Sequence, residues 1–495
     1  MRPRLRPSFG LAVAAAGLFL AALDAYVVVT LLPRMLSDVD LPVDRLEAAS
    51  PIITGFLAGY VVAMPLLGAA SDLRGRLPVY LASLAVFGLG SVLTALAGTL
   101  AWLVVGRVLQ GLGGGALVPL TLALAADLYP AGRRGVVLGL VSGVQEAGSV
   151  VGPVWGTAVA LLGGWRVAFW LNLPLVLLIG LVLWRSTPTP SASGGGTSPR
   201  SGEGASSPDL VGAGLLGLGV GALAVALYPD QPSVRAVNYW WAPLSALAAL
   251  LLGAYLWRQL RRLEPLIARP LLASPPFWGA LLANLLVGGA LMVALVDVPI
   301  FARGVFNVDQ NAAGLLLTAF LVGVPVGAVV GGWGATRSGP RLPAVAGLLL
   351  AGGVFLLLAG WGVKEPRARA YVELAVMGLG FGVVIAPLAA SALDATRRRE
   401  HGLVSSLLVA ARTVGMLGAL AALTAFGLHR FYQLLKPPPD TGSLHDRLQA
   451  LEANVTSALV AEYHEIFLLA ALLCLAAAVI AGLTLGPRRP VHISE

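Results

Sequence analysis

Long apolar runs, separated by short stretches rich in arginine, proline and glycine, dominate this sequence. Most runs reach the roughly 20 residues that an α-helix needs to cross a bilayer. They predict fourteen spanning helices, near residues 10–33, 51–71, 77–98, 101–128, 135–162, 167–185, 209–229, 239–258, 277–300, 310–335, 341–362, 370–393, 402–435 and 460–485. Only 12% of the residues are charged, against about 25% in soluble domains. The sequence therefore predicts an all-α membrane protein and excludes a soluble enzyme.

The few lysines and the single cysteine exclude several other classes. Cys474 has no partner cysteine within the chain, so no internal disulfide is expected. Neither Lys364 nor Lys436, the only lysines, follows a glycine, which excludes the phosphate-binding loop of an ATP-driven pump. The net charge of +9 comes from arginines that stand singly between apolar runs, and this pattern sets membrane orientation rather than nucleic-acid binding. We expect no enzymatic activity, no metal or organic cofactor, and no nucleic-acid partner.

The loops predict how the chain is oriented. With a cytoplasmic amino terminus, most arginines fall in cytoplasmic loops, including Arg74, Arg76, Arg133, Arg134 and the run 397–399. The outer loops contain acidic residues, namely Asp38, Asp40, Asp44 and Glu47. The first apolar run is longer than the roughly 7–15 residues of a signal peptide's apolar region, so it reads as the first span. We expect a multi-pass protein of the bacterial inner membrane with both termini in the cytoplasm.

A composition break divides the chain. The segment 186–208 is rich in serine, glycine and proline, as in a flexible cytoplasmic linker. Six predicted spans precede it (1–185). An inserted helix pair (209–258) and six further spans (259–495) follow. We expect two six-helix bundles plus two inserted helices.

Two turns repeat the same spacing of glycines. One turn contains Gly68, Asp72, Gly75 and Arg76. The corresponding turn of the second bundle contains Gly332, Thr336, Gly339 and Arg341. The equal interval from first to last glycine indicates that the two bundles are related halves of one fold.

Four ionisable residues lie inside predicted spans, where charge is costly and therefore a sign of function. They are Asp24, Arg107, Glu146 and Arg412. The simpler interpretation is that the two acids and two bases pair across the interface of the halves and fix helix rotation. The sharper hypothesis is that a carboxylate exchanges a proton while its arginine partner is released. Asp297 lies near the outer end of its span, so a structural role is expected for it.

One predicted span carries small residues at intervals of about four. Gly148, Gly152 and Gly156 share a helical face, and Pro153 allows a bend. Such a face permits close helix packing, although the pattern is weak evidence in a chain with 61 glycines.

Taken together, these motifs resemble the major facilitator superfamily. The resemblance rests on three motifs: GAASDLRGR (68–76), Arg107 with Gln110 and Gly111, and Gly152-Pro153. Fourteen spans are typical of its drug:proton antiporter branch. Further segments, among them LDAYVVVT and HGLVSSLLVAARTVGM, resemble the mycobacterial lipid exporters of that branch, which work with a lipid-carrier lipoprotein.

The resemblance implies roles for several residues. Asp24, Glu146 and Arg412 look like the essential membrane-embedded charges, while Gly68, Asp72, Gly75 and Arg76 look like the cytoplasmic gate. Two departures stand out: the run 26–29 is Tyr-Val-Val-Val where drug antiporters have Thr and Asn, and Leu73 replaces an arginine. The first departure disfavours a small hydrophilic cargo.

The end of the chain is unusually long for a final pair of spans. The run 402–435 extends roughly 50 Å as a helix, whereas a bilayer core is about 30 Å thick. Residues 444–463 keep one apolar helical face. We expect an extended periplasmic hairpin around 428–462 that guides lipid or docks a carrier. The alternative is an amphipathic helix lying on the membrane surface.

These observations favour a proton-coupled exporter of apolar cargo, most simply a triacylglyceride-like lipid. Asp24 and Glu146 are the candidate proton carriers, Arg412 their partner, and Arg107 a polar pivot. The expected partners are lipid, membrane lipids and a periplasmic lipoprotein carrier, with a monomeric transporter. One alternative is a multidrug:proton antiporter for amphiphilic drugs. Another is an uncoupled lipid scramblase, or a scaffold for a periplasmic carrier.

Overall fold

The computed structural model describes residues 7–39, 50–185, 209–228, 237–262, 266–308, 310–363, 365–397, 400–435 and 444–486. In this part of the chain the regular structure is helical. The first bundle consists of α1 (Pro7–Ser37), α2 (Ser50–Arg74), α3 (Arg76–Leu96), α4 (Leu100–Leu128), α5 (Ala131–Gly163) and α6 (Trp165–Arg185). An inserted pair follows, α7 (Leu210–Leu227) and α8 (Trp241–Arg261). The rest is α9 (Arg269–Leu272), α10 (Pro275–Gly304), α11 (Gln310–Ser338), α12 (Arg341–Leu358), α13 (Arg367–Asp394), α14 (His401–Leu434) and α15 (Leu444–Thr484).

Thirteen of the described helices are long and apolar enough to cross a membrane. The fourteenth expected span also forms a helix, α8, but two tryptophans and the polar end 258–261 make it less apolar than the rest. The short α9 was not expected from the sequence. The fold is therefore that of an all-α, multi-pass membrane protein, as predicted, while the linker 186–208 lies outside the described residues.

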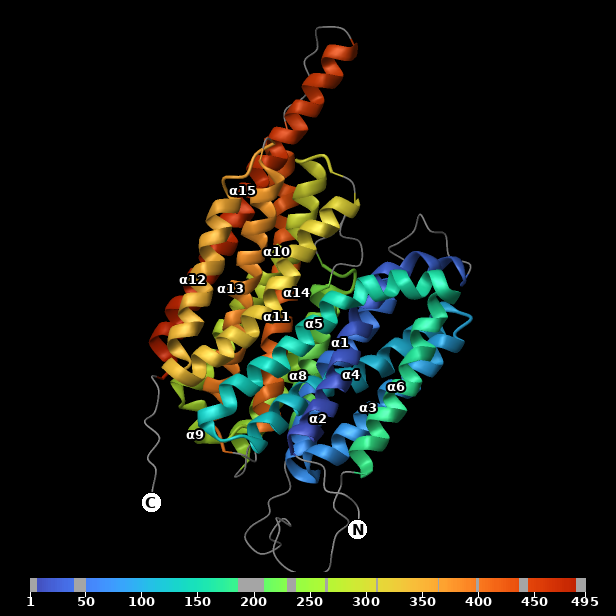
Figure 1. The fold of residues 1–495 in the computed structure, drawn as a ribbon, viewed down its shortest axis with the longest axis vertical. Helices are drawn as coiled ribbons and strands as arrows, with labels where there is room; N and C mark the ends of the chain where they lie inside the picture. Colours follow the sequence, from blue (N-terminus) through green and yellow to red (C-terminus); the bar gives the residue numbers. More distant parts are fainter. Residues whose placement is uncertain are drawn as a thin grey trace, which may run out of the picture.

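Two bundles make up the body of the molecule (Figure 1). Helices α1–α6 form one half and α10–α15 the other. The halves meet where α5 packs on α11 and where α14 packs on α2 and α4. From this contact the two bundles diverge toward the opposite end of the molecule (Figure 1).

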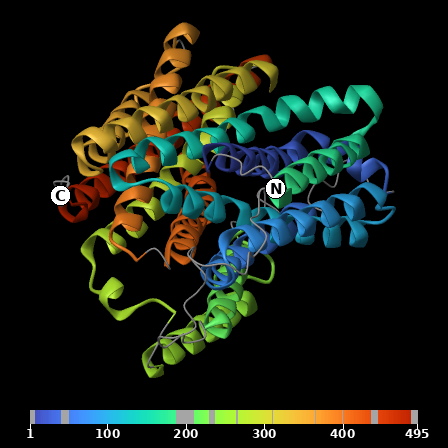
Figure 2. The same cartoon turned by 60° about the horizontal axis from the view of Figure 1, so that its bottom comes forward.

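The inserted pair packs on both halves. Helices α7 and α8 pack on each other, and α7 also packs on α2 of the first half and on α14 of the second (Figure 2). Asp209 caps the first turn of α7 by accepting from the N–H of Gly212, and it accepts two further bonds of 2.8 Å from Arg258 of α8. This buried carboxylate therefore joins the two inserted helices at one end.

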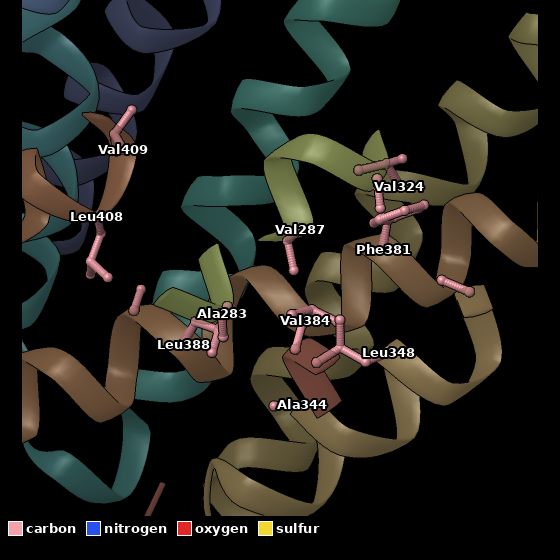
Figure 3. Close-up of a cluster of buried hydrophobic side chains, with 14 of the residues drawn as sticks. Ala283, Val287, Val324, Ala344, Leu348, Phe381, Val384, Leu388, Leu408 and Val409 are labelled. Carbon is pink, nitrogen blue, oxygen red and sulfur yellow. The ribbon is translucent and has the colours of Figure 1, made fainter. Parts of the chain in front are cut away.

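The second half has a dry, close-packed core. Val287 of α10, Val324 of α11, Leu348 of α12 and Phe381 of α13 meet there (Figure 3). In a bilayer, burial against lipid gains little, so this interdigitation holds the helices through close contact.

The two ends of the molecule differ. The "turn end" has the α2–α3 turn at Gly75 and the α11–α12 turn at Gly339, whose φ angles are 89° and 81°. Only glycine adopts such angles without strain. The matching conformations show that the glycine repeat of the sequence marks two equivalent turns, one in each half.

We call the opposite end of the molecule the "projecting end", because α15 extends beyond the other helices there. This helix has 41 residues, or roughly 60 Å at 1.5 Å per residue. Arg430 near the end of α14 donates to Glu465 of α15 at 2.6–3.0 Å, which fixes the register of the two helices. The first turns of α15 consequently extend past the end of α14 and beyond the other helices (Figure 1). The loop of the expected hairpin, 436–443, lies outside the described residues.

Candidate functional site

A charged pair joins the two halves in the middle of their interface. Arg412 of α14 donates from one guanidinium nitrogen to Glu146 Oε1 of α5, at 3.2 Å. Both groups are partly shielded, with 12% of the arginine and 16% of the glutamate side chain exposed. The pair supplies the two opposite charges that an ion lock between the halves requires, and water has limited access to both of them.

Two tyrosines surround this pair. Tyr26 of α1 and Tyr60 of α2 lie within electrostatic range of both Glu146 and Arg412. Tyr26 is 36% exposed although it lies in the middle of a span. The site thus draws one polar side chain from each of four helices, three in the first half and one in the second.

Close helix packing places both members of the pair. The backbone of α14 at Arg412 lies directly against Gly288 of α10. On the other side, a Cβ at Gly148 would stand 2.6 Å from the carbonyl oxygen of Phe19, and one at Gly152 would stand 2.8 Å from that of Leu23. The glycine face of α5 therefore packs on α1 beside Glu146.

Gly156 continues this face, since its Cβ would stand 2.9 Å from the carbonyl oxygen of Val27. Pro153 lies within helix α5, but its side chain lies outside the described residues. A larger residue at any of these three glycines would push α1 and α5 apart.

Asp24 and Arg107 form a second pair, inside the first half. Arg107 of α4 donates to Asp24 Oδ2 of α1 at 2.7 Å, and each residue is 1% exposed. Gln110 donates to both carboxylate oxygens at 3.1 Å, and Asn172 of α6 donates to Oδ1 at 2.7 Å. The Arg107 guanidinium also lies 4.2 Å from the centre of the Phe56 ring.

The sequence allowed all four buried charges to pair across the interface of the two halves. In the structure Asp24 pairs with Arg107 within the first half, and Glu146 pairs with Arg412 across the interface. A carboxylate with three donor side chains is strongly stabilised as the anion. In this conformation Asp24 holds α1, α4 and α6 together, whereas Glu146 has a single bonded partner among the described residues.

At the turn end, Asp72 of α2 caps the start of α14 in the other half. Its two oxygens accept from the backbone N–H groups of Gly402 and Leu403 at 3.1 and 3.0 Å. Arg76 pairs with the same carboxylate and donates to Asp127 Oδ2 of α4 at 3.0 Å. A negative charge at a helix amino terminus is favourable, so this contact holds the halves together.

Gly68 makes the contact possible, because a Cβ there would stand 2.6 Å from the carbonyl oxygen of Gly402. His401 adds a bond across the halves, with Nδ1 2.8 Å from Asp127 Oδ1. Ser405 of α14 also donates to the carbonyl oxygen of Pro119 in α4 at 2.9 Å.

The second half repeats this arrangement. Thr336 Oγ1 of α11 accepts from the N–H of Val136, near the start of α5, at 3.2 Å. A Cβ at Gly135 would stand 2.7 Å from the carbonyl oxygen of Gly332. Arg134 pairs with Asp394 of α13 nearby. Both crossings of the two halves at the turn end therefore combine a glycine contact with a backbone N–H donating to a side-chain oxygen of the other half, and only the Asp72 contact caps a helix.

Sequence reasoning missed Asp127, His401, Asn172 and Asp394. Each lies at or near a helix end or in an otherwise apolar span, where only the partner reveals its role. A polar cavity of about 320 Å³ lies among Asp127, Arg134, Asp394 and His401 at the turn end. Among the described residues, no group of three or more His, Cys, Asp or Glu side chains could hold a metal ion.

Several known proteins are similar to this chain over nearly its whole length. The chain is 42% identical to the triacylglyceride transporter of Mycolicibacterium hassiacum, over 100% of this chain and 95% of that protein. It is 39% identical to the triacylglyceride transporter of Mycolicibacterium smegmatis, over 98% of this chain and 89% of that protein. It is 40% identical to that of Mycobacterium tuberculosis, over 96% and 94%.

Solved structures share the fold at low sequence identity. The human organic anion transporter MFSD10 (TETRAN) has a TM-score of 0.61 at 18% identity, and the match covers 95% of this chain and 100% of that one. The Escherichia coli fucose:proton symporter FucP has a TM-score of 0.57 at 14% identity, over 93% and 99%. Residues 14–212 and 210–420 each match the Major Facilitator Superfamily. The chain therefore belongs to the major facilitator superfamily and is a membrane transporter, not an enzyme.

Proposed function

We propose that this transporter is a proton-coupled exporter of a triacylglyceride-like lipid. The observation that carries the proposal is the Glu146–Arg412 pair, which bridges α5 of the first half and α14 of the second. Movement of one half against the other must stretch or break this pair. A proton on Glu146 would remove its negative charge and release Arg412.

The proposed step is a simple exchange at Glu146. A proton binds one carboxylate oxygen and cancels the ionic attraction to Arg412, so the halves can separate at this level. Loss of the proton restores the attraction. Glu146 suits this role better than Asp24, because Asp24 is almost fully buried and has three donor side chains in place. We therefore propose Asp24 and Arg107 as the pair that holds the first half in shape, with a proton-carrying role for Asp24 as a second possibility in another conformation.

The proposed cargo rests on the relatives and on the character of the chain. Relatives at 39–42% identity over nearly the whole length are named triacylglyceride transporters. A lipid passes between apolar helices without the cost of burying polar groups.

We place the turn end in the cytoplasm of the bacterial inner membrane and the projecting end in the periplasm. The arginines near the turn end, Arg74, Arg76, Arg133 and Arg134, favour that side. The contacts that close the turn end then correspond to a state closed toward the cytoplasm, with the two bundles diverging toward the periplasm (Figure 1). The projecting turns of α15 would guide lipid outward or dock a lipoprotein carrier.

Proteoliposomes test the proposal directly. The purified chain is reconstituted with a fluorescent triacylglyceride, and lipid transfer to acceptor vesicles is measured with and without an imposed pH gradient. Transfer should depend on the gradient and fall about tenfold or more in Glu146→Gln. Glu365→Gln, which neutralises a glutamate of the α12–α13 connection that pairs with the exposed Arg369, is the matched control and should transport normally.

Three results would overturn the proposal. Equal transfer with and without the gradient would indicate an uncoupled scramblase. Gradient-driven movement of an amphiphilic cation such as ethidium, without movement of triacylglyceride, would indicate a multidrug antiporter. Binding of a periplasmic carrier without lipid transfer in either condition would indicate a scaffold.

A further inference from the structure

Two acidic side chains are buried inside the second half, away from the interface with the first. Asp297 of α10 is 8% exposed and Glu462 of α15 is 7% exposed. Asp297 lies one helical turn before Phe301, and Glu462 immediately precedes Tyr463. The rings of Phe301 and Tyr463 are in contact, with centroids 5.6 Å apart. The two acids therefore lie near one aromatic contact between α10 and α15, within electrostatic range of each other.

The two acids have no compensating partner. Among the described residues, neither carboxyl accepts a hydrogen bond or pairs with a cation. Glu462 Oε1 lies against α14 at Gly427. Because glycine has no side chain, the carboxyl oxygen fits into the space that a Cβ would fill.

The other ionisable groups of this region are engaged with one another. Arg430 of α14 is bound to Glu465 of α15. His464 of α15 bonds to the backbone carbonyl oxygen of Trp361, at 2.6 Å from Nε2. Glu373 of α13 accepts from the Trp361 indole at 2.7 Å and pairs with Arg369. Tyr463 is neutral at ordinary pH. Nothing in this set offsets a negative charge on Asp297 or Glu462.

Two uncompensated carboxylates within electrostatic range of each other in an apolar interior are unfavourable, and the usual relief is that one of them is protonated. We propose that Asp297 and Glu462 form a proton-binding site of their own, which holds one proton at neutral pH. The proton sits on one of the two carboxyl groups, so the pair carries one negative charge. Release of the proton to water leaves two carboxylates and two negative charges.

The position of the site gives the proton a mechanical effect. Asp297, Glu462 and Gly427 lie where α10, α14 and α15 meet, below the turns of α15 that project. A Cβ at Gly304 would stand 3.1 Å from Leu459, so α10 and α15 are still in close contact one turn further out. When the site holds its proton, these contacts stay closed. When the proton leaves, repulsion between the two carboxylates loosens α15 from α10 and makes the projecting turns more mobile.

The site is separate from the Glu146–Arg412 pair and does not depend on the cargo. Its test uses the full chain in lipid nanodiscs, with no transport assay. Infrared difference spectroscopy across neutral pH should show a protonated-carboxyl band that disappears as pH rises. The double variant Asp297→Asn/Glu462→Gln should lose the band, whereas Glu452→Gln should keep it.

A second measurement tests the mechanical effect. Hydrogen exchange in residues 444–465 is compared between the wild type and the double variant at the same pH, so that intrinsic exchange rates cancel. Above the infrared midpoint the wild type should exchange several-fold faster, and below it the two proteins should match.

Three outcomes would overturn the proposal. The first is an infrared band unchanged in the double variant. The second is equal exchange of 444–465 in both proteins on both sides of the midpoint. The third is a midpoint that shifts when sodium replaces choline in the buffer, since that would assign the site to a metal cation.

Discussion

The Asp72 carboxylate and the Thr336 hydroxyl occupy equivalent positions in the two halves and make equivalent contacts. Asp72 accepts from the N–H groups that begin α14, and Thr336 accepts from the N–H of Val136 near the start of α5. Each therefore joins its own half to a helix of the opposite half. Asp72 carries a charge and has Arg76 beside it, so the contact with α14 is the stronger of the two.

Removing the stronger cap should open the turn end. We expect Asp72→Ala to weaken closure by about 1–2 kcal/mol, because a charged helix cap is lost and Arg76 loses a partner. The reporter is Ser405→Cys, a buried position whose hydroxyl contacts α4, in a Cys474→Ala background. Its reaction with a water-soluble maleimide should rise roughly 5- to 30-fold. An unchanged rate would mean that Asp72 does not hold the turn end closed.

The glycine contacts should be intolerant of even one methyl group. We expect Gly135→Ala to prevent full closure, because its Cβ would stand 2.7 Å from the carbonyl oxygen of Gly332. Gly132→Ala, one turn away on the same helix, is the matched control, since nothing lies within 4 Å of its Cβ. Maleimide labelling at residue 405 should rise in the first variant and not in the second. Equal labelling in both would contradict the close approach of α5 and α11.

The Asp24–Arg107 pair should contribute to the stability of the first half. We expect Asp24→Asn to cost about 3–5 kcal/mol, because the buried Arg107 loses its counter-charge. The apolar double variant Asp24→Leu/Arg107→Met should recover much of this loss, since it leaves no uncompensated charge. Thermal unfolding in detergent measures both. A single variant as stable as the wild type would show that the pair has no structural role.

A pH dependence is expected at the projecting end of the first half. The Trp165 indole donates to Asp38 at 2.9 Å and Arg166 pairs with it. The Trp165 hydrogen bond first, and then Arg166, hold the pKa of Asp38 below its usual value against the opposing effect of burial. A lowered folded-state pKa stabilises the fold above about pH 4. That contribution is lost as pH falls further, through the folded-state pKa.

Trp165→Phe removes the indole donor, so the folded-state pKa of Asp38 moves back toward its unfolded value. Thermal stability above about pH 4 should then be slightly lower than in the wild type, and the loss of stability on acidification should be smaller. The effect should be small, because the Asp38 side chain is largely in water. Glu452→Gln is the control and should leave the profile unchanged. Superimposable profiles for Trp165→Phe and the wild type would contradict this role for the indole.

Several features of the fold could be predicted from the sequence. The apolar runs predicted the helices, and the repeated glycine spacing predicted two equivalent turns, because a turn with positive φ depends on glycine alone. An amphipathic face feeding straight into an apolar run favoured one continuous helix at the end of the chain, and α15 has 41 residues.

The partners of the buried charges could not be predicted. In a membrane protein the faces toward lipid and toward other helices are both apolar, so periodicity does not reveal the rotation of a helix. Arg107 therefore could not be assigned to Asp24 rather than Glu146 from spacing. The contact of His401 with Asp127, 274 residues apart in the chain, likewise depends on how the two halves dock.

The central claim is that Glu146 exchanges a proton as lipid moves. The most direct measurement is proton flux into proteoliposomes that contain a pH-sensitive dye, before and after addition of triacylglyceride. The wild type and Glu365→Gln should show proton flux that starts with the lipid, and Glu146→Gln should show none while keeping its helical content. Lipid movement without any lipid-dependent proton flux in the wild type, or normal flux in Glu146→Gln, would contradict the claim.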